Sequence, residues 1–148
     1  VFRDVFSFKL WKFSKAIVLF ANKKEFKKID FKLNKKEISR AIVWLFYHSK
    51  DLLKKYKSEL EKEMNLVRSA DLLLKLVFLI NNRPLPIDKW ILSEYENLTW
   101  KPKSFLKNID RSIKKQDEKY LLLSRKIIGK YLRQNKLISQ EDWEYIEG

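Results

Sequence analysis

The chain of 148 residues has no cysteine, two glycines, three prolines and a single histidine. Without cysteine there is no disulfide framework and no thiolate nucleophile or metal ligand, and this absence fits a reducing compartment. Strand-rich folds need many glycine and proline turns, so their scarcity favours long helices. The glycines, Gly129 and Gly148, are too far apart to form a glycine-rich phosphate loop.

Long hydrophobic runs are also absent. The longest, Leu72 to Ile80, contains Lys75 and is much shorter than the ~20 apolar residues that cross a bilayer. Residues 2–21 are rich in aromatic side chains but include five charged residues, so they resemble neither a membrane span nor a signal peptide. We therefore expect a cytoplasmic protein with no membrane partner.

The chain is strongly basic, with 33 Lys and Arg against 19 Asp and Glu and a net charge of +14. Residues 9–36 alone contain ten lysines and two acids. Such a field attracts polyanions, including RNA and nucleotides. Lysine outnumbers arginine 26 to 7, whereas specific phosphate recognition favours arginine. The charge is therefore explained equally well by solvated helix surfaces.

Apolar residues recur at helical spacing along the whole chain and predict an all-α protein, a single helical bundle of about six helices in one domain over residues 1–148. The predicted helices cover residues 2–21, 35–63, 66–81, 88–96, 103–115 and 117–134, with a last turn at 139–146. Asn34 with Glu37, and Ser139 with Asp142, predict helix caps. Met64 and Asn65 mark an interruption or a turn.

Individual residues add detail to this bundle. The helix at 66–81 is apolar nearly all round and should be the central one, with Asp71 and Lys75 paired four residues apart. In the helix before it, Leu60 belongs to the inward stripe. Gly129 lies within a helix and should permit close packing.

The chain has five tryptophans. Trp11 and Trp44 lie in apolar stripes and are expected in the core. Trp90 and Trp100 lie at loop–helix junctions near prolines. They act either as packing plugs or as platforms on which a base or another aromatic ligand stacks.

One candidate site is the pair Arg40 and His48 on the second helix. An Arg and a His on one helix resemble the metal-independent site of HEPN ribonucleases, which are also small helical bundles. That motif has four to six intervening residues, and here there are seven. The spacing places the two side chains about 80° apart and roughly two turns distant. A surface or half-buried histidine is the competing interpretation.

No metal site or complete active site is recognisable in the chain. Its acid pairs, such as Glu59 with Glu63 and Glu94 with Glu96, lie among lysines on exposed helical stretches and are best explained as solvated faces. No nucleophile elbow or Ser/His/Asp set is visible.

The more informative stretch is residues 76–90. An apolar helix runs into Asn81, Asn82 and Arg83, two prolines break it, and Lys89 and Trp90 open the next element. A helix that ends in polar, cationic and aromatic groups on a stiff loop can present a binding surface.

Residues 66–100 resemble the helical C-terminal domain of polymerase-beta-like nucleotidyltransferases. Those domains have a buried helix that ends in asparagine and is followed by proline and by Lys-Trp. The matching residues are Asn81, Pro86, Lys89 and Trp90, with Pro102 similar to a downstream proline that begins the next helix. The chain departs from the pattern before the second proline, where it has Leu85 instead of an aromatic residue.

The resemblance implies that an α/β catalytic domain, with a Gly-Ser motif and carboxylates that bind magnesium and the nucleotide, works with this chain in cis or in trans. Neither feature is present here, and the chain begins at Val1 rather than Met. The expectation is a helical accessory or substrate-binding domain, the C-terminal part of a longer nucleotidyltransferase or a stand-alone relative, that is non-catalytic by itself. Its substrate-binding strip would be Asn81, Arg83, Lys89 and Trp90.

Two alternatives remain open at this point. A basic RNA-binding helical module would explain the charge and the loop tryptophans, with RNA or another polyanion as partner. A HEPN-like ribonuclease that uses Arg40 and His48 ranks third because its spacing departs from the motif.

Overall fold

The computed structural model describes residues 35–86 and 88–147. These residues form six α-helices and one 3₁₀ turn, with no strand among them, which confirms the all-α bundle. The elements are α2 (Lys35–Asp51), α3 (Glu59–Ile80), η1 (Asp88–Trp90), α4 (Ile91–Glu96), α5 (Phe105–Lys115), α6 (Lys119–Gln134) and α7 (Gln140–Glu147). The predicted helix at 2–21, Trp11 and the Asn34 cap lie outside the described residues.

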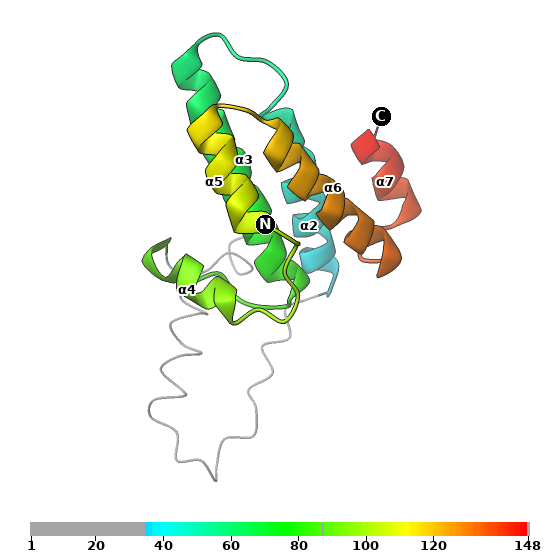
Figure 1. Ribbon diagram of the computed structural model, residues 1–148. Coiled ribbons are helices and arrows are strands. Elements are labelled where there is room, and N and C mark those ends of the chain that lie inside the picture. The colour runs from blue at the N-terminus through cyan, green and yellow to red at the C-terminus, as the bar shows by residue number, and fades with distance from the viewer. Residues whose placement is uncertain (1–34, 87, 148) are drawn as a thin grey trace.

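Helix α3 runs through the middle of the bundle (Figure 1). It packs along α2 on one side and against α5 and α6 on the other, while α7 lies on α2. The short helix α4 lies at one end of the bundle, near the C-terminal end of α3. Buried side chains of α3, such as Leu66, Leu73 and Phe78, form the centre of the core.

The apolar character of α3 therefore predicted its central place correctly. Asp71 and Lys75 form the expected ion pair, with 2.5 Å between the carboxylate and the amine. Both side chains stay partly exposed, so this pair adds little to stability. None of the described helices is both long and apolar enough to cross a membrane.

The predicted helix over residues 35–63 is wrong, because the chain leaves the helix after Asp51 and starts α3 at Glu59. The Ser58 hydroxyl accepts a hydrogen bond from the backbone N–H of Glu61 (3.1 Å) and caps the new helix. The Glu61 carboxylate in turn accepts one from the N–H of Lys57 (2.7 Å). These bonds satisfy donors that a helix start leaves without partners.

Because α3 begins at Glu59, several residues lie in surroundings that differ from those predicted. Met64 and Asn65 lie inside α3 rather than at a turn. Leu60, expected in the core, is 67% exposed. The helices predicted from residues 103 and 117 begin at Phe105 and Lys119 instead.

Three other predictions about packing differ in outcome. Gly129 does permit close packing, since a Cβ atom there would lie 2.9 Å from Cζ of Phe46. Trp44 is 43% exposed, so its assignment to the core is wrong. Trp100 acts as a packing plug, with its ring stacked on Tyr131 at 3.9 Å between centroids.

The helix ends show the consequence of having few glycines. Among the residues that the structure describes, four non-glycine residues have a positive φ, namely Asn82 (52°), Ser104 (59°), Gln116 (51°) and Lys136 (52°). All four lie at the start or just past the end of a helix. A short cap also starts α7, where the N–H of Asp142 donates to the Ser139 hydroxyl at 3.1 Å, as predicted.

Candidate functional site

The end of α3 forms a rigid corner around Asn81. Its Nδ2 donates to the carbonyls of Val77 (2.8 Å) and Trp100 (2.9 Å), and its Oδ1 accepts from the N–H of Trp100 (2.8 Å). The carboxamide therefore joins the end of α3 to the loop before α5. With both donor hydrogens and one acceptor site occupied, Asn81 holds the corner rather than presenting its side chain to a ligand.

The chain after Asn81 is also firmly held. Asn82 adopts a left-handed conformation, and the N–H of Arg83 donates to the carbonyl of Phe78 (3.0 Å), which closes the end of the helix. Leu85 and Pro86 are buried, so the position where the nucleotidyltransferase pattern has an aromatic residue here belongs to the core. Arg83 itself is exposed and forms no ion pair with a described residue.

The next element presents Lys89 and Trp90. Both side chains are exposed, Trp90 by 46%, and the Lys89 ammonium lies 5.4 Å from the centroid of the Trp90 ring. Of the four residues of the predicted strip, the structure thus places Arg83, Lys89 and Trp90 on the surface between α3 and α4. The side chain of Asn81 is instead hydrogen-bonded to Val77 and Trp100.

Behind this surface, α4 is anchored by Tyr95. Its side chain is buried against Phe105, with 5.9 Å between ring centroids. Burial, assisted by the charge of neighbouring Glu96, raises the pKa of Tyr95 to about 12. The phenol is therefore neutral at physiological pH, and its ring packs α4 against α5.

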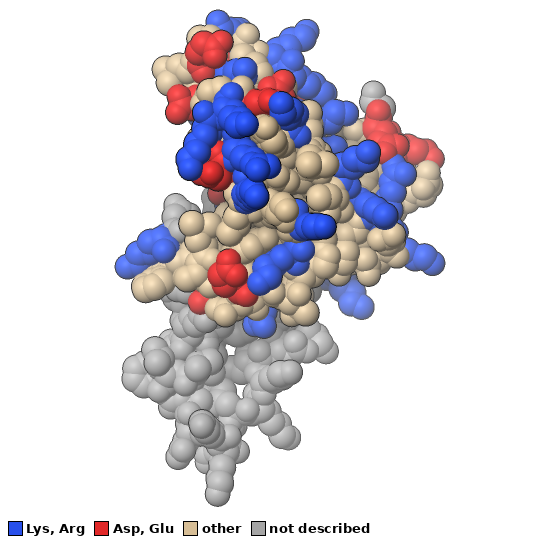
Figure 2. Space-filling model, viewed as in Figure 1, with Lys and Arg blue, Asp and Glu red and all other residues tan. Residues whose placement is uncertain are grey.

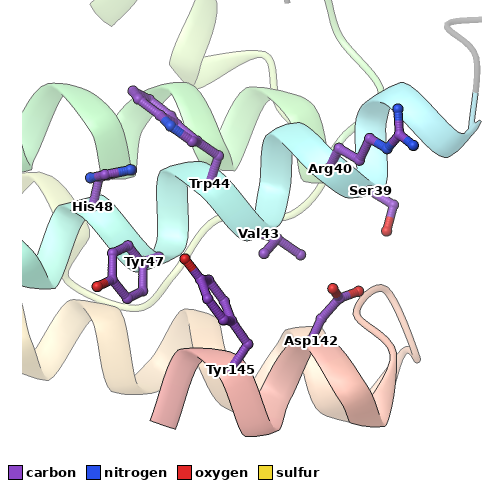
Figure 3. A pocket seen from close by; sticks show the side chains of 8 residues that line it. All are labelled: Ser39, Arg40, Val43, Trp44, Tyr47, His48, Asp142 and Tyr145. Carbon is purple, nitrogen blue, oxygen red and sulfur yellow. The ribbon is translucent and has the colours of Figure 1, made fainter. Parts of the chain in front are cut away.

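The other predicted pair, Arg40 and His48, lines a pocket of about 290 Å³ between α2 and α7. Figure 3 shows Arg40 and His48 at opposite ends of this pocket, with the Tyr145 ring between them from α7. The geometry does not bring the two side chains together on one phosphate group. The ribonuclease hypothesis stays a prediction that this arrangement does not favour.

Aromatic rings surround His48. Its imidazole lies 4.5 Å from the Trp44 ring and 5.1 Å from the Tyr47 ring, and Tyr47 stacks on Tyr145 at 5.4 Å. Asp142, the acid in the pocket lining, is bonded by the Ser139 hydroxyl at 2.7 Å. His48 therefore sits in an aromatic cluster, and within residues 35–86 and 88–147 no carboxylate is hydrogen-bonded to it to orient it as a base.

A second groove, of about 730 Å³, was missed by sequence reasoning. It runs between α2, α6 and α7 and is lined by several basic residues, including Arg125 and Lys126. A sequence signal did exist, because Lys126, Lys130 and Arg133 recur at helical spacing along α6. Within residues 35–86 and 88–147, His, Asp and Glu side chains form no cluster of three or more that could hold a metal ion.

A scan against protein-family models, a search of curated proteins and a search of solved structures each found no match for the chain. The nucleotidyltransferase resemblance, with its magnesium, nucleotide and catalytic partner domain, stays a prediction. The functional argument therefore rests on the geometry of the described residues.

Proposed function

We propose that this bundle is a substrate-binding helical domain that acts with a nucleotidyltransferase catalytic domain, in cis or in trans, and is non-catalytic by itself. The observation that carries the proposal is the exposed cation–aromatic pair of Lys89 and Trp90 beside a corner fixed by Asn81. A ring of this kind can stack on a base, and the neighbouring cations can bind phosphate oxygens. Magnesium and the reacting nucleotide would be bound by the catalytic domain.

The rigidity of the corner supports this role. Binding orders side chains and loops at a cost in entropy, and a surface that is already fixed reduces that cost. Hydrogen bonds of Asn81 and of the Arg83 backbone hold residues 81–83 and Trp100 in place. The exposed side chains Arg83, Lys89 and Trp90 are not needed for those bonds, so they remain available to a ligand.

The RNA-binding alternative ranks second. Figure 2 shows Lys and Arg spread over the visible face of the described bundle, with Asp and Glu among them, rather than gathered in one continuous stripe. A stripe or patch is the usual footprint of a nucleic-acid interface, and the basic residues that recur along α6 line a groove that also has an apolar wall. Salt dependence distinguishes the two functions, because binding through many phosphate contacts weakens steeply between about 50 and about 200 mM salt.

The proposal predicts that ATP contacts Trp90. We expect the ¹⁹F resonance of Trp90, in chain labelled with 5-fluorotryptophan, to shift during titration with ATP, with an affinity in roughly the millimolar range. The resonance of Trp44, which lies on α2 and lines neither this surface nor the groove beside α6, should not move. The Trp90→Phe variant identifies the resonance to be followed.

The matched controls are two arginine variants. Arg83→Ala should weaken ATP binding about fivefold or more, because it removes a charged donor. Arg68→Ala removes an exposed arginine of α3 and should leave binding unchanged. An unmoved Trp90 signal at about ten millimolar ATP, or equal losses in the two variants, would exclude the proposed surface. Tighter binding of a structured RNA than of polyphosphate at the higher salt would favour the RNA module.

A further inference from the structure

The groove between α2, α6 and α7 has an unbalanced charge. Five basic residues line it and face one acid, which gives a net charge of +4. These residues are Lys50, Arg125, Lys126, Lys130 and Arg133, with Glu147 as the acid. Glu147 is already engaged by the Arg133 guanidinium. The three lysines form no ion pair with a described residue, so the positive charge of the groove is only partly balanced.

Arg125 is the best-fixed of these cations. Its Nε donates to the carbonyl of Phe46 at 3.1 Å, and its guanidinium carbon lies over the Phe46 ring, 3.8 Å from the centroid. Burial lowers the pKa of Arg125 to about 10, while the charge of Glu147 opposes that shift. The group is still protonated at neutral pH, and a partly buried charge with no paired counter-ion is costly.

Hydrogen bonding in the groove is incomplete as well. Nη2 of Arg125 and Nε1 of Trp143 are buried and have no hydrogen-bond partner among the described residues. Both side chains belong to the lining of the groove. Buried donors normally have acceptors, so two unpaired donors beside an excess of positive charge indicate a site built for an acceptor-rich anion.

The rest of the lining indicates what else the anion contains. Leu122 and Leu123 of α6 line the groove and are exposed by 39% and 50%, and Ile127 lies on the same helix. A volume of about 730 Å³ is in the range of small-molecule sites. Inorganic phosphate would leave this apolar wall in contact with water, whereas a ligand with a flat apolar part would cover it.

We propose that this groove binds an organic phosphate, with Arg125 as the anchoring cation, the lysines around the phosphate and the apolar wall of α6 against the organic part. The site lies away from α4 and the Trp90 surface (Figure 1). It does not depend on the proposed function.

The test uses three probes with the full chain in isothermal titration calorimetry: 1-naphthyl phosphate, inorganic phosphate and 1-naphthol. We expect 1-naphthyl phosphate to bind at least about tenfold more tightly than inorganic phosphate, and 1-naphthol to give no measurable heat. Equal binding of the two phosphates, or binding of 1-naphthol alone, would overturn the proposal.

Variants locate the site. Arg125→Met keeps the aliphatic stem of the side chain and removes the guanidinium, and we expect it to weaken 1-naphthyl phosphate binding about tenfold or more. The melting temperature of the unliganded variant should change little, because the loss of the contacts with Phe46 is offset by the removal of a partly buried charge that pairs with no described acid. A residue with a purely structural role would instead lower the melting temperature and leave the affinity of the folded protein unaltered.

Further substitutions keep the test decisive if Arg125→Met folds poorly. Lys126→Ala combined with Lys130→Ala, at exposed positions, should weaken the binding of 1-naphthyl phosphate several-fold. Glu147→Gln should strengthen that binding by about threefold, because the substitution removes the acid and releases Arg133. Lys107→Ala, on the exposed side of α5, is the matched control and should have no effect. Wild-type affinity in the lysine double variant would contradict the site.

Discussion

Phe46→Ala should lower the free energy of unfolding by about 3–5 kcal/mol, the range for removing a buried aromatic ring. The Phe46 side chain is 2% exposed and connects three helices. Its ring meets the edge of Trp143 at 5.4 Å between centroids, lies under the Arg125 guanidinium and fits against Gly129. Removing the ring therefore leaves a cavity at the junction of α2, α6 and α7.

Urea unfolding followed by circular dichroism would measure this loss. Tyr145→Ala is the matched control, because Tyr145 is aromatic but 66% exposed, and we expect it to cost less than about 1 kcal/mol. Gly129→Ala gives a second check: in the Phe46→Ala background its Cβ has room, and the better helix propensity should stabilise the protein by up to about 1 kcal/mol. Similar losses for Phe46→Ala and Tyr145→Ala would mean that the ring does not hold this junction.

Asn81→Ala should lower the free energy of unfolding by about 2–4 kcal/mol. The substitution removes three hydrogen bonds and leaves the N–H and carbonyl of Trp100 without their partner. Each hydrogen bond contributes about 1 kcal/mol, and an unsatisfied buried group costs more. Asn81→Asp should be at least as harmful, since it keeps the acceptor but turns a carboxylate oxygen toward two carbonyl oxygens.

The same urea measurement applies, with Asn97→Ala as the control. Asn97 also donates to a backbone carbonyl, that of Ser93, but it is exposed and the bond is long (3.4 Å). We expect that control to cost under about 0.5 kcal/mol. Equal costs for the two variants would show that Asn81 does not hold the corner, and its carboxamide would again be a candidate ligand group.

Local sequence signals were sufficient for much of the fold. The run of apolar residues in α3 predicted its central position, because a helix without a polar face has to be buried on all sides. The boundary between α2 and α3 was missed because the spacing of apolar residues continues through Leu52 and Tyr56 to Leu60. The Ser58 and Glu61 cap indicates this boundary more directly, since both side chains bond to backbone groups at the start of the helix.

The candidate sites show the limits of that approach more clearly. Prolines and charge predicted that Arg83, Lys89 and Trp90 belong to a surface segment. The hydrogen bonds from Asn81 to Trp100 cross 19 positions, and the one from Arg125 to Phe46 crosses 79. A periodic pattern holds no information about such pairings, because they depend on how whole helices pack.

The left-handed residues at the helix ends affect which substitutions this protein can tolerate. Outside glycine, and to a lesser degree asparagine, that conformation costs about 1–2 kcal/mol at each position. Ser104, Gln116 and Lys136 all hold it, and their side chains are not in the apolar core. Because glycine is scarce at these helix ends, replacing one of these residues with glycine should raise the thermal stability of the protein. Substitutions there can offset damaging changes elsewhere without altering either of the proposed binding surfaces.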